Sequence, residues 1–275
     1  MNNVEGRSMK SKFLSCLLFL SACTLSVSGH ANDSVAALDA GGIVLGKSDD
    51  IVMEREDLFI SEEQIRVSYI FRNTSDKPIN TRVAFPVPEF PEHPDGDMSI
   101  DTSSKNPLKF SVSVEGKQKA FETELKKADG NISITHHWLQ TFPAKSTLAV
   151  SHTYKPAVGG EAGFYFGGQE RAARIKQYCI EPNLIKGIDR QITDGYTAKL
   201  GPGFVHYEIK TGANWKGPIG QFRLTVKKQN ANDKVSFCGT GVKKLDAKTF
   251  VMEKKQFTPT DNLYVMFLHT GENSE

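Results

Sequence analysis

The stretch that decides the fold is Ile65–Pro88, which reads IRVSYIFRNTSDKPINTRVAFPVP. Up to Arg72, apolar and polar residues largely alternate, which is the period-two pattern of a β-strand with one face against a core. A turn rich in Asn, Ser, Asp and Pro follows, and a second alternating run begins at Ile79. The pattern predicts a β-hairpin that opens a sandwich. Because proline lacks the N–H that a strand ladder needs, Pro86 and Pro88 should end the second strand or lie on a sheet edge.

Short runs of this kind continue along most of the chain and predict a mainly β protein with an antiparallel β-sandwich architecture. Between Gln169 and Ile192, apolar residues lie among Arg and Lys and are interrupted by Pro182 and Gly187, which predicts one or two short helices. The expected organisation is two β subdomains with a short helical insert between them. Its parts are a signal peptide at 1–31, an N-terminal β-sandwich domain at 32–160, a loop and short helical connector at 161–198, and a C-terminal β region at 199–275.

Individual strands follow from the same alternation. They are expected at 51–53, 58–60, 110–114, 132–142, 147–154, 204–209, 222–226, 234–237, 249–252 and 263–268. The runs Ile51–Met53 and Leu58–Ile60 are read as separate because charged residues lie between them. The last run, Leu263–Leu268, is apolar on both faces, which is typical of a central strand.

The N-terminus has the composition of an export signal. Basic residues precede an apolar run from Phe13 to Cys23, and small residues lead up to Ala31. This order predicts a secretory signal peptide over residues 1–31, cleaved after Ala31. The expected location is therefore outside the cytoplasm, in the periplasm or cell envelope.

Two details of this segment stay open. Leu20–Cys23 resembles the lipobox of bacterial lipoproteins, so the alternative is a protein anchored to the membrane through a lipidated Cys23. The true start is either Met1 or Met9, because a start at Met9 places the basic residues at the very N-terminus.

The charge of the exported part is balanced. The chain of 275 residues has 34 basic and 32 acidic residues, and removal of residues 1–31 takes away three basic residues and one acidic residue. The remainder has no formal net charge, so nothing in the composition points to nucleic acid as a partner. Its length suffices for one large or two small β domains with a real core.

Two cysteines remain after export, Cys179 and Cys238. In an oxidising compartment an isolated pair most simply forms one disulfide. A catalytic thiol is the alternative, but two distant cysteines without a Cys-x-x-Cys spacing disfavour it. The disulfide would link the helical insert to a later strand.

Histidines give the weak candidates for a metal site: His136, His137 and His152. Imidazoles at the ends of neighbouring strands can converge on zinc. Adjacent residues on a strand point to opposite faces, however, so His136 and His137 cannot both face one site. His152 shares its face with three apolar side chains, which indicates a hydrogen-bonded, semi-buried residue. No metal and no other cofactor is expected.

Motifs of common enzymes are missing from the sequence. It has no Gly-x-Ser-x-Gly, no His-Glu-x-x-His, no P-loop and no dinucleotide-binding fingerprint. Paired carboxylates that act on glycosides become neighbours only in the fold, so the sequence does not test them. A non-enzymatic protein is the expectation, and a metal-dependent hydrolase acting on envelope material is the alternative.

Large aromatic residues are the candidates for a ligand-binding groove, because their faces can stack on a glycan or a peptide. The predicted members are Trp215, Phe164, Tyr165 and Phe166, with Trp138 considered beside them. The competing interpretation is that these side chains fill the core, as most large aromatics of sandwiches do.

Several stretches resemble one bacterial envelope family, known only as domain of unknown function 4424. They include Leu58-Phe59-Ile60-Ser61, Val83-Ala84-Phe85-Pro86, Tyr178-Cys179, Asn214–Val226 and Ser236-Phe237-Cys238. The resemblance covers nearly all of the chain after residue 31. It implies export and a β-rich fold but brings no activity.

A weaker similarity links Tyr69–Pro88 to the opening of vault/inter-alpha-trypsin domains, which supports a sandwich only. Together these observations predict an exported β-sandwich protein that binds an envelope protein or another envelope component. Contact with the membrane itself is expected only if Cys23 is lipidated.

Overall fold

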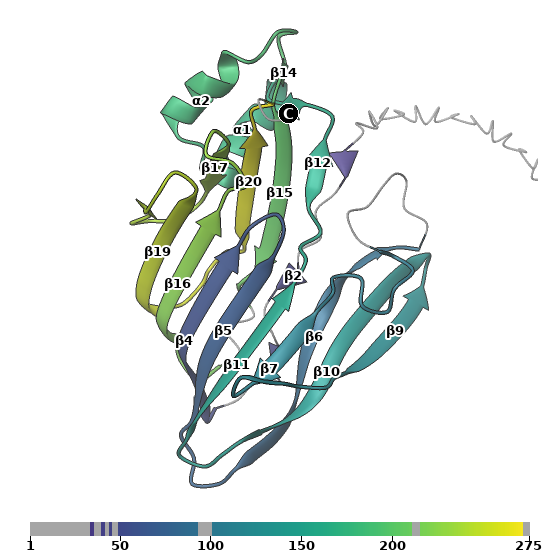
Figure 1. Ribbon diagram of the computed structural model, residues 1–275, viewed down its shortest axis with the longest axis vertical. Helices are drawn as coiled ribbons and strands as arrows, with labels where there is room; N and C mark the ends of the chain where they lie inside the picture. Colours follow the sequence, from purple (N-terminus) through teal and green to yellow (C-terminus); the bar gives the residue numbers. More distant parts are fainter. Residues whose placement is uncertain are drawn as a thin grey trace, which may run out of the picture. The chain divides into compact units, whose positions relative to one another are not determined.

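The computed structural model describes residues 34–35, 40–41, 44–45, 49–92, 101–210 and 215–271 (Figure 1). The predicted signal peptide, with Cys23, both candidate start residues and the cleavage site after Ala31, lies outside these residues. The described part of the chain is mainly β, as predicted, with two helices, α1 (Gly168–Tyr178) and α2 (Pro182–Asp189). Neither helix is long and apolar enough to cross a membrane.

The largest described sheet has eight strands, and the second largest has six. The order in the eight-stranded sheet is β18 (Lys243–Lys244), β19 (Thr249–Phe257), β16 (Ile219–Lys227), β4 (Ile51–Ile60), β5 (Ile65–Asn73), β11 (Thr147–Tyr154), β7 (Ser111–Val114) and β8 (Lys117–Gln118). The six-stranded sheet has the order β1 (Ser34–Val35), β12 (Gly159–Glu161), β15 (Gly201–Glu208), β20 (Leu263–His269) and β17 (Lys234–Phe237), and its sixth strand, β2 (Ala40–Gly41), pairs with β15.

The remaining strands form two smaller sheets. One has the order β3 (Val44–Leu45), β6 (Ile79–Pro91), β10 (Asn131–Phe142) and β9 (Glu122–Ala128), and the other pairs β13 (Phe164–Tyr165) with β14 (Thr197–Ala198). Among the described strands the pairings are antiparallel except for β16 with β4 and β15 with β2. The antiparallel β architecture predicted from the sequence is therefore confirmed, with two parallel pairs added.

The predicted hairpin over residues 65–88 is wrong, although both of its strands exist. β5 pairs with β4 and β11 in the eight-stranded sheet, whereas β6 pairs with β3 and β10 in the four-stranded sheet. The two strands belong to opposite layers, where Phe85 of β6 packs on Tyr154 of β11 with 5.0 Å between ring centroids. A strand alternates in the same way whether its chain neighbour lies beside it or across the core, so the pattern alone does not separate the two cases.

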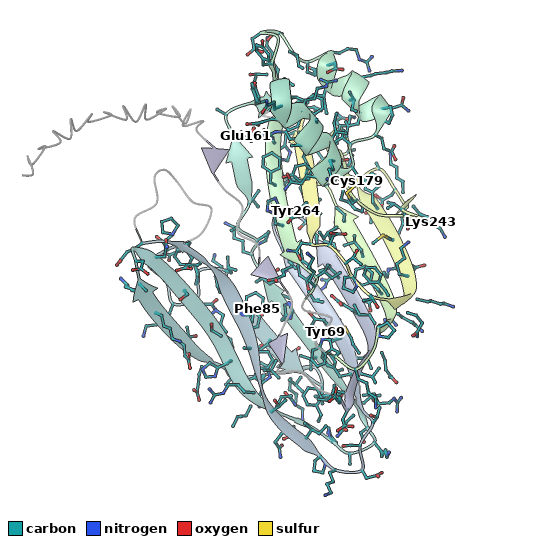
Figure 2. All side chains as sticks on the ribbon, turned by 180° about the vertical axis from the view of Figure 1, so that it is seen from behind. Tyr69, Phe85, Glu161, Cys179, Lys243 and Tyr264 are labelled. Carbon is teal, nitrogen blue, oxygen red and sulfur yellow. A yellow bond between two sulfur atoms is a disulfide. The ribbon has the colours of Figure 1, made fainter. Side chains whose placement is uncertain are left out.

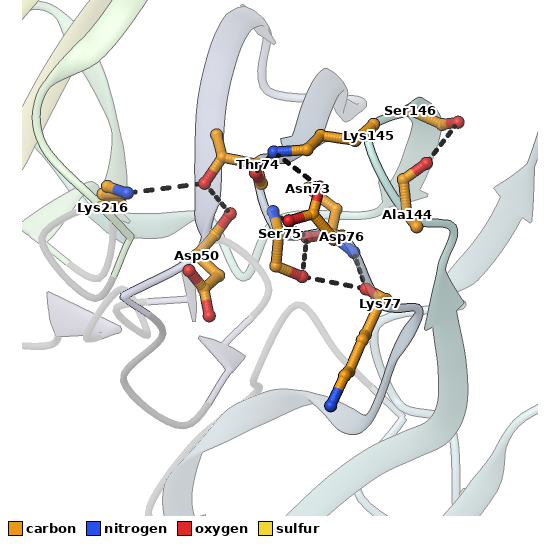
Figure 3. Close-up of polar contacts among 10 residues, drawn as sticks. All are labelled: Asp50, Asn73, Thr74, Ser75, Asp76, Lys77, Ala144, Lys145, Ser146 and Lys216. Atoms are coloured by element: carbon orange, nitrogen blue, oxygen red, sulfur yellow. Dashed lines mark hydrogen bonds and ion pairs between the residues drawn. The ribbon is translucent and has the colours of Figure 1, made fainter.

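Asn73, the last residue of β5, fixes the turn that carries the chain between the layers (Figure 3). Its buried side-chain amide donates to the carbonyl oxygens of Lys77 and Phe142, at 2.8 and 3.0 Å, and its oxygen accepts from the backbone N–H of Ser75 at 2.9 Å. The next residue, Thr74, donates its N–H to the carbonyl oxygen of Asp50 at 2.8 Å. These bonds join the ends of β4, β5 and β10, so the polar turn connects two sheets instead of closing a hairpin.

Pro86 lies within β6, which continues to Pro91, so the expectation that it ends the strand is wrong. The alternative, an edge strand, does not describe β6 either, because β6 lies between β3 and β10 in its sheet. Pro86 is opposite Thr135 of β10, and the neighbour on the other side, β3, pairs only with Val83 and Ala84. Since no described strand needs an N–H on that side, proline is tolerated there.

One hydrophobic cluster joins the three larger sheets. It includes Phe85 of β6, Tyr69 of β5 and Tyr207 of β15, so the four-stranded and the six-stranded sheets pack against the eight-stranded sheet (Figure 2 labels Tyr69 and Phe85). A second cluster lies on the other face of the six-stranded sheet, where Ile188 of α2 and Tyr178 of α1 pack with Phe204. The helices therefore cover one face of a sheet whose opposite face belongs to the main core.

β4 is one strand of ten residues, which corrects the expectation of two short runs at 51–53 and 58–60. A register shift between Met53 and Arg55 changes the side on which the residues of β4 point. After this irregularity Glu56 faces the core together with Leu58 and Ile60. Alternation counted forward from Ile51 and Met53 places Glu56 on the outward side, whereas the register shift turns it inward.

The predicted domain boundaries at residues 160 and 198 stay predictions. The connector 161–198 does contain α1 and α2, but β16, β18 and β19 of the predicted C-terminal region extend the same sheet as β4 and β5. The strands expected at 204–209, 222–226, 234–237, 249–252 and 263–268 correspond to β15, β16, β17, β19 and β20. β20 is a central strand, as its apolar faces indicate.

Candidate functional site

A hollow of about 480 Å³ lies beside β17, the last strand of the six-stranded sheet. We call it the edge pocket. Its lining comes from α2, from β17 and the loop after it, and from β18 and β19. The residues are Cys179, Glu181, Leu184, Val235, Ser236, Phe237, Gly239, Gly241, Val242, Lys244 and Phe250.

The edge pocket runs along the free edge of β17. Three successive residues of this strand, Val235, Ser236 and Phe237, line it. Val235 and Phe237 pack toward the main core, whereas the Ser236 hydroxyl points to α1 and donates to the carbonyl oxygen of Tyr178 at 2.9 Å. Because successive side chains of a strand point to opposite faces, a hollow that touches all three lies at the strand's edge.

The disulfide predicted from the sequence lies at one end of the edge pocket, beside the end of β17. Cys179 and Cys238 are joined, with 2.01 Å between the sulfur atoms and 5.0 Å between the Cα atoms. Cys179 ends α1 in the left-handed conformation, and Cys238 follows directly after β17. The bridge therefore links the helical connector to the strand whose edge lines the pocket.

The loop after β17 forms the opposite wall. A Cβ atom on Gly239 would lie 2.8 Å from the side-chain sulfur of Met252 in β19, so a larger residue there would have to displace this flexible side chain. Gly241 adopts a φ of +75°, which favours glycine. These two positions allow the loop to fold against β19 and to place Val242 and Lys244 at the pocket.

Apolar side chains and lysines make up the surface of the site. The side chains of Leu184, Val235, Phe237, Val242 and Phe250 are half-buried and line the hollow. Lys244 lines the hollow, whereas Lys234 and Lys243 do not line it but are exposed next to lining residues in the chain; Figure 2 labels Lys243 and Cys179.

An electrostatic effect of these lysines appears at Lys228. Burial lowers the pKa of its ammonium group, and the positive charges of Lys234 and Lys244 lower it further, against the opposing effect of Asp233. The site is thus an apolar hollow with a basic rim, which is suited to an apolar group that carries negative charge nearby.

Three of the four predicted ligand-binding aromatics are buried. Trp215 packs in the main core, with its ring centroid 4.3 Å from that of Phe71. Phe164 and Phe166 belong to the cluster under the helices, and only Tyr165 keeps ring surface exposed. Trp138 is also buried.

None of the four predicted aromatics lines the edge pocket. A ligand-binding role for these aromatic residues stays a prediction. Because three of them are packed in the core, Tyr165 is the one of the four with ring surface available to a ligand. The competing interpretation, that large aromatics of a sandwich fill its core, describes the other three.

The candidate histidines lie in different surroundings. His136 is buried and its Nδ1 is 2.9 Å from the Thr123 hydroxyl, while burial lowers its pKa to about 4. His137 points to the other face, where its Nε2 is 3.3 Å from a carboxylate oxygen of Glu124. Adjacent histidines thus face opposite sides, as predicted. In the described part of the chain, no group of three or more His, Cys, Asp or Glu side chains is placed to hold a metal ion.

His152 corrects the expectation of a hydrogen-bonded, semi-buried residue. It is completely buried among aromatic rings, and within the described residues neither ring nitrogen has a hydrogen-bond partner. Burial lowers its pKa to about 3, so the imidazole is neutral at physiological pH. The buried face predicted from Leu148, Val150 and Tyr154 is confirmed.

Sequence reasoning missed one buried polar group, which is centred on Glu56. Burial raises the pKa of its carboxyl group to about 8, although a hydrogen bond from Tyr207 opposes the shift. The Tyr207 hydroxyl is also 3.5 Å from that of Tyr69. The carboxyl group is therefore largely protonated at neutral pH. The signal that would have found it is the alternation counted backward from Ile60 and Leu58, which reaches Glu56.

Comparison with known families and structures adds a family and a fold. The sequence profile described as Domain of unknown function (DUF4424) matches residues 31–136 and 125–266. Among curated proteins, none matches the sequence.

Among solved structures, a Legionella pneumophila protein with a proposed role in nutrient binding matches with a TM-score of 0.57 and 18% sequence identity. The match covers 87% of this chain and 73% of that chain, so the two share a fold.

Two peptidase-type enzymes match more weakly. Native leukotriene A4 hydrolase from yeast has a TM-score of 0.35 and 10% identity, over 80% of this chain and 29% of that chain. The M1 zinc metallopeptidase from Deinococcus radiodurans has a TM-score of 0.28 and 12% identity, over 80% and 43%. This chain spans less than half the length of either enzyme, and at these TM-scores the likeness supports no inference.

Proposed function

Because the chain belongs to the family described as domain of unknown function 4424, which has no activity attached, we propose its role from its own residues. The protein is exported to the cell envelope, where it binds another envelope protein or envelope component without catalysing a reaction. The observation that carries the binding role is the edge pocket.

The edge pocket has the properties of a recognition site. It is a concavity of about 480 Å³, within the range of ligand sites, and it combines apolar walls with a few polar groups at defined places. At one end the Cys179–Cys238 disulfide limits how far the end of α1 and the end of β17 can separate. The Legionella protein of the same fold, with its proposed role in nutrient binding, is compatible with a binding function.

Export is supported by the order of basic, apolar and small residues before Ala31 and by the disulfide, because disulfides persist in oxidising compartments. We expect the mature protein purified from the periplasmic or envelope fraction to begin at Asn32, as read by N-terminal sequencing and intact mass. Replacing Cys23 by Ser should leave this processing unchanged. An acyl mass on Cys23, or loss of processing in the variant, would establish the lipoprotein alternative instead.

Site-specific photo-crosslinking tests the binding role. A photoreactive residue in place of Lys244, at the edge pocket, should form a covalent adduct with a partner when the cells are irradiated. The matched control is Lys117, because β8 and β18 are both two-residue strands at the opposite edges of one sheet, and both lysines are exposed. An adduct at Lys244 and none at Lys117 is the expected result. Equal labelling at both positions, or none at either, contradicts a partner at the edge pocket.

A further inference from the structure

We propose that the occupant of the edge pocket is an extended, acidic polypeptide segment that adds to β17 as a new strand. This inference rests on the proposed binding function and names the chemistry of the partner. The segment would place one large apolar side chain in the hollow and its carboxylates opposite the lysines of the rim.

The first support is the unpaired edge of β17. In the described part of the chain this strand pairs only with β20, through Lys234–Phe237 opposite Leu268–Val265. A strand with one neighbour still presents backbone N–H and C=O groups on its other side, and these can hydrogen-bond to an added strand. Main-chain bonds of this kind give affinity in β-strand addition, while pockets for alternate side chains give specificity.

The second support is the shape of the surroundings. Leu184 of α2 stands on one side of the edge, and Val242 and Phe250 stand on the other (Figure 1 shows β17 between the helices and β19). Phe237, Val242 and Phe250 supply an apolar contact for one side chain of the added strand.

The third support is charge. Lys234 begins β17, while Lys243 and Lys244 form β18 across the hollow, and all three are exposed. Among the lining residues Lys244 is the one basic residue and Glu181 the one acidic residue, so the excess of positive charge comes from Lys234 and Lys243 next to the lining. A segment with alternating carboxylates matches this distribution, because opposite charges speed association and fix the register of the complex.

A protected edge is the competing explanation for the same strand. Proteins shield free edges with short strands and lysines, and β17 has four residues beginning with Lys234. Protection, however, requires no hollow along the edge and no apolar wall beside it. The edge pocket with its apolar residues is the observation that favours an occupant.

Synthetic peptides of about ten residues, the length of a strand, test the inference on the complete mature protein. The parent peptide alternates Glu with Val and has one central Phe, and its binding is followed by fluorescence anisotropy at low salt. Two derivatives carry N-methyl groups at alternate residues, one derivative for each edge of the peptide. We expect one derivative to bind about tenfold more weakly and the other to bind like the parent, because only one edge pairs with β17 and loses about two hydrogen bonds.

Charge reversal gives an independent measurement. The double variant Lys234→Glu, Lys244→Glu should bind the parent peptide about tenfold more weakly, whereas Lys117→Glu on the far edge of the eight-stranded sheet should bind it like wild type. A peptide with Lys in place of Glu should show the reverse preference for the double variant.

Each other outcome overturns the inference. If both N-methylated peptides bind as tightly as the parent, no strand is added, and if the parent does not bind at all, the assigned chemistry is wrong. An adduct at Lys244 in the crosslinking experiment would still support the proposed function in these cases. Absence of that adduct as well would remove the proposed function together with the inference.

Discussion

The double variant Cys179→Ser, Cys238→Ser is expected to lose about 4 kcal/mol of unfolding free energy relative to the oxidised wild type. The bridge closes a loop between residues 59 positions apart, and removing it frees the unfolded chain to explore many more conformations. Both cysteines are exposed, so serine in their place leaves no buried polar group without a partner. Urea unfolding, followed through the buried Trp138 and Trp215, measures the loss.

Reduction provides the control for this prediction. Treating the wild type with a thiol reductant should lower its unfolding midpoint to that of the double variant, and the same reductant should leave the variant unchanged. A variant with the wild-type midpoint would show that the bridge contributes nothing to the stability of the fold. Loss of stability without loss of the crosslink at Lys244 would separate the role of the disulfide in folding from its role at the edge pocket.

The second large effect is expected at Glu56, as a change in how stability depends on pH. The carboxyl group titrates near pH 4.5 when the chain is unfolded and near pH 8 when it is folded. Between these values the unfolded state has released the proton and the folded state has kept it. Stability contributed at this position is therefore complete below pH 4.5 and falls as the pH rises toward 8.

Glu56→Gln removes this titration while keeping the size of the side chain and an oxygen that accepts from Tyr207. Relative to the variant, the wild type should lose about 3 kcal/mol of unfolding free energy between pH 5 and pH 8. The comparison of two pH values cancels any difference in hydrogen bonding that the amide group introduces. Urea unfolding at both pH values measures it.

Glu54→Gln is the matched control, because Glu54 lies on the same strand but is partly exposed and pairs with Arg72. Its unfolding free energy should follow the wild type across the pH range. Parallel stability curves for the wild type and Glu56→Gln would mean that Glu56 ionises inside the folded protein, and the account of its buried, neutral carboxyl group would be wrong.

Much of the secondary structure was predictable because local alternation carries it. The strands from Asn131 to Tyr154, together with β15, β16, β17, β19 and β20, lie where apolar and polar residues alternate or where a run is wholly apolar. Pro182, expected to interrupt the helical segment, is the first residue of α2, where its missing N–H costs nothing. The disulfide followed from the number of cysteines and from the expectation of an oxidising compartment.

The pairing of the strands was not predictable in the same way. β5 and β6 follow each other along the chain but belong to different layers, because Asn73 and its partners direct the turn across the core. One of those partners is the carbonyl oxygen of Phe142, which is 69 residues away. A bond of this kind has no signature in the stretch that it organises.

The candidate site shows the same division. Its lining spans Cys179 to Phe250 and comes from a helix, a strand edge and a loop of another sheet. Most of the aromatic residues predicted to bind a ligand lie in the core, because removing a large apolar ring from water stabilises the folded state. The residues that line the edge pocket are ordinary Leu, Val, Phe and Lys, which carry no motif.

By itself, the sequence determined the β character of this protein, the positions of most strands, the two short helices and the identity of the bridged cysteines. Those properties depend on neighbours within a few residues or on the redox chemistry of one residue type. Tertiary structure alone decided which strands pair, that Glu56 is buried and neutral, and that β17 leaves an open edge beside an apolar, lysine-rimmed hollow. These properties arise where segments far apart in the chain meet, and local patterns of polarity do not encode such meetings.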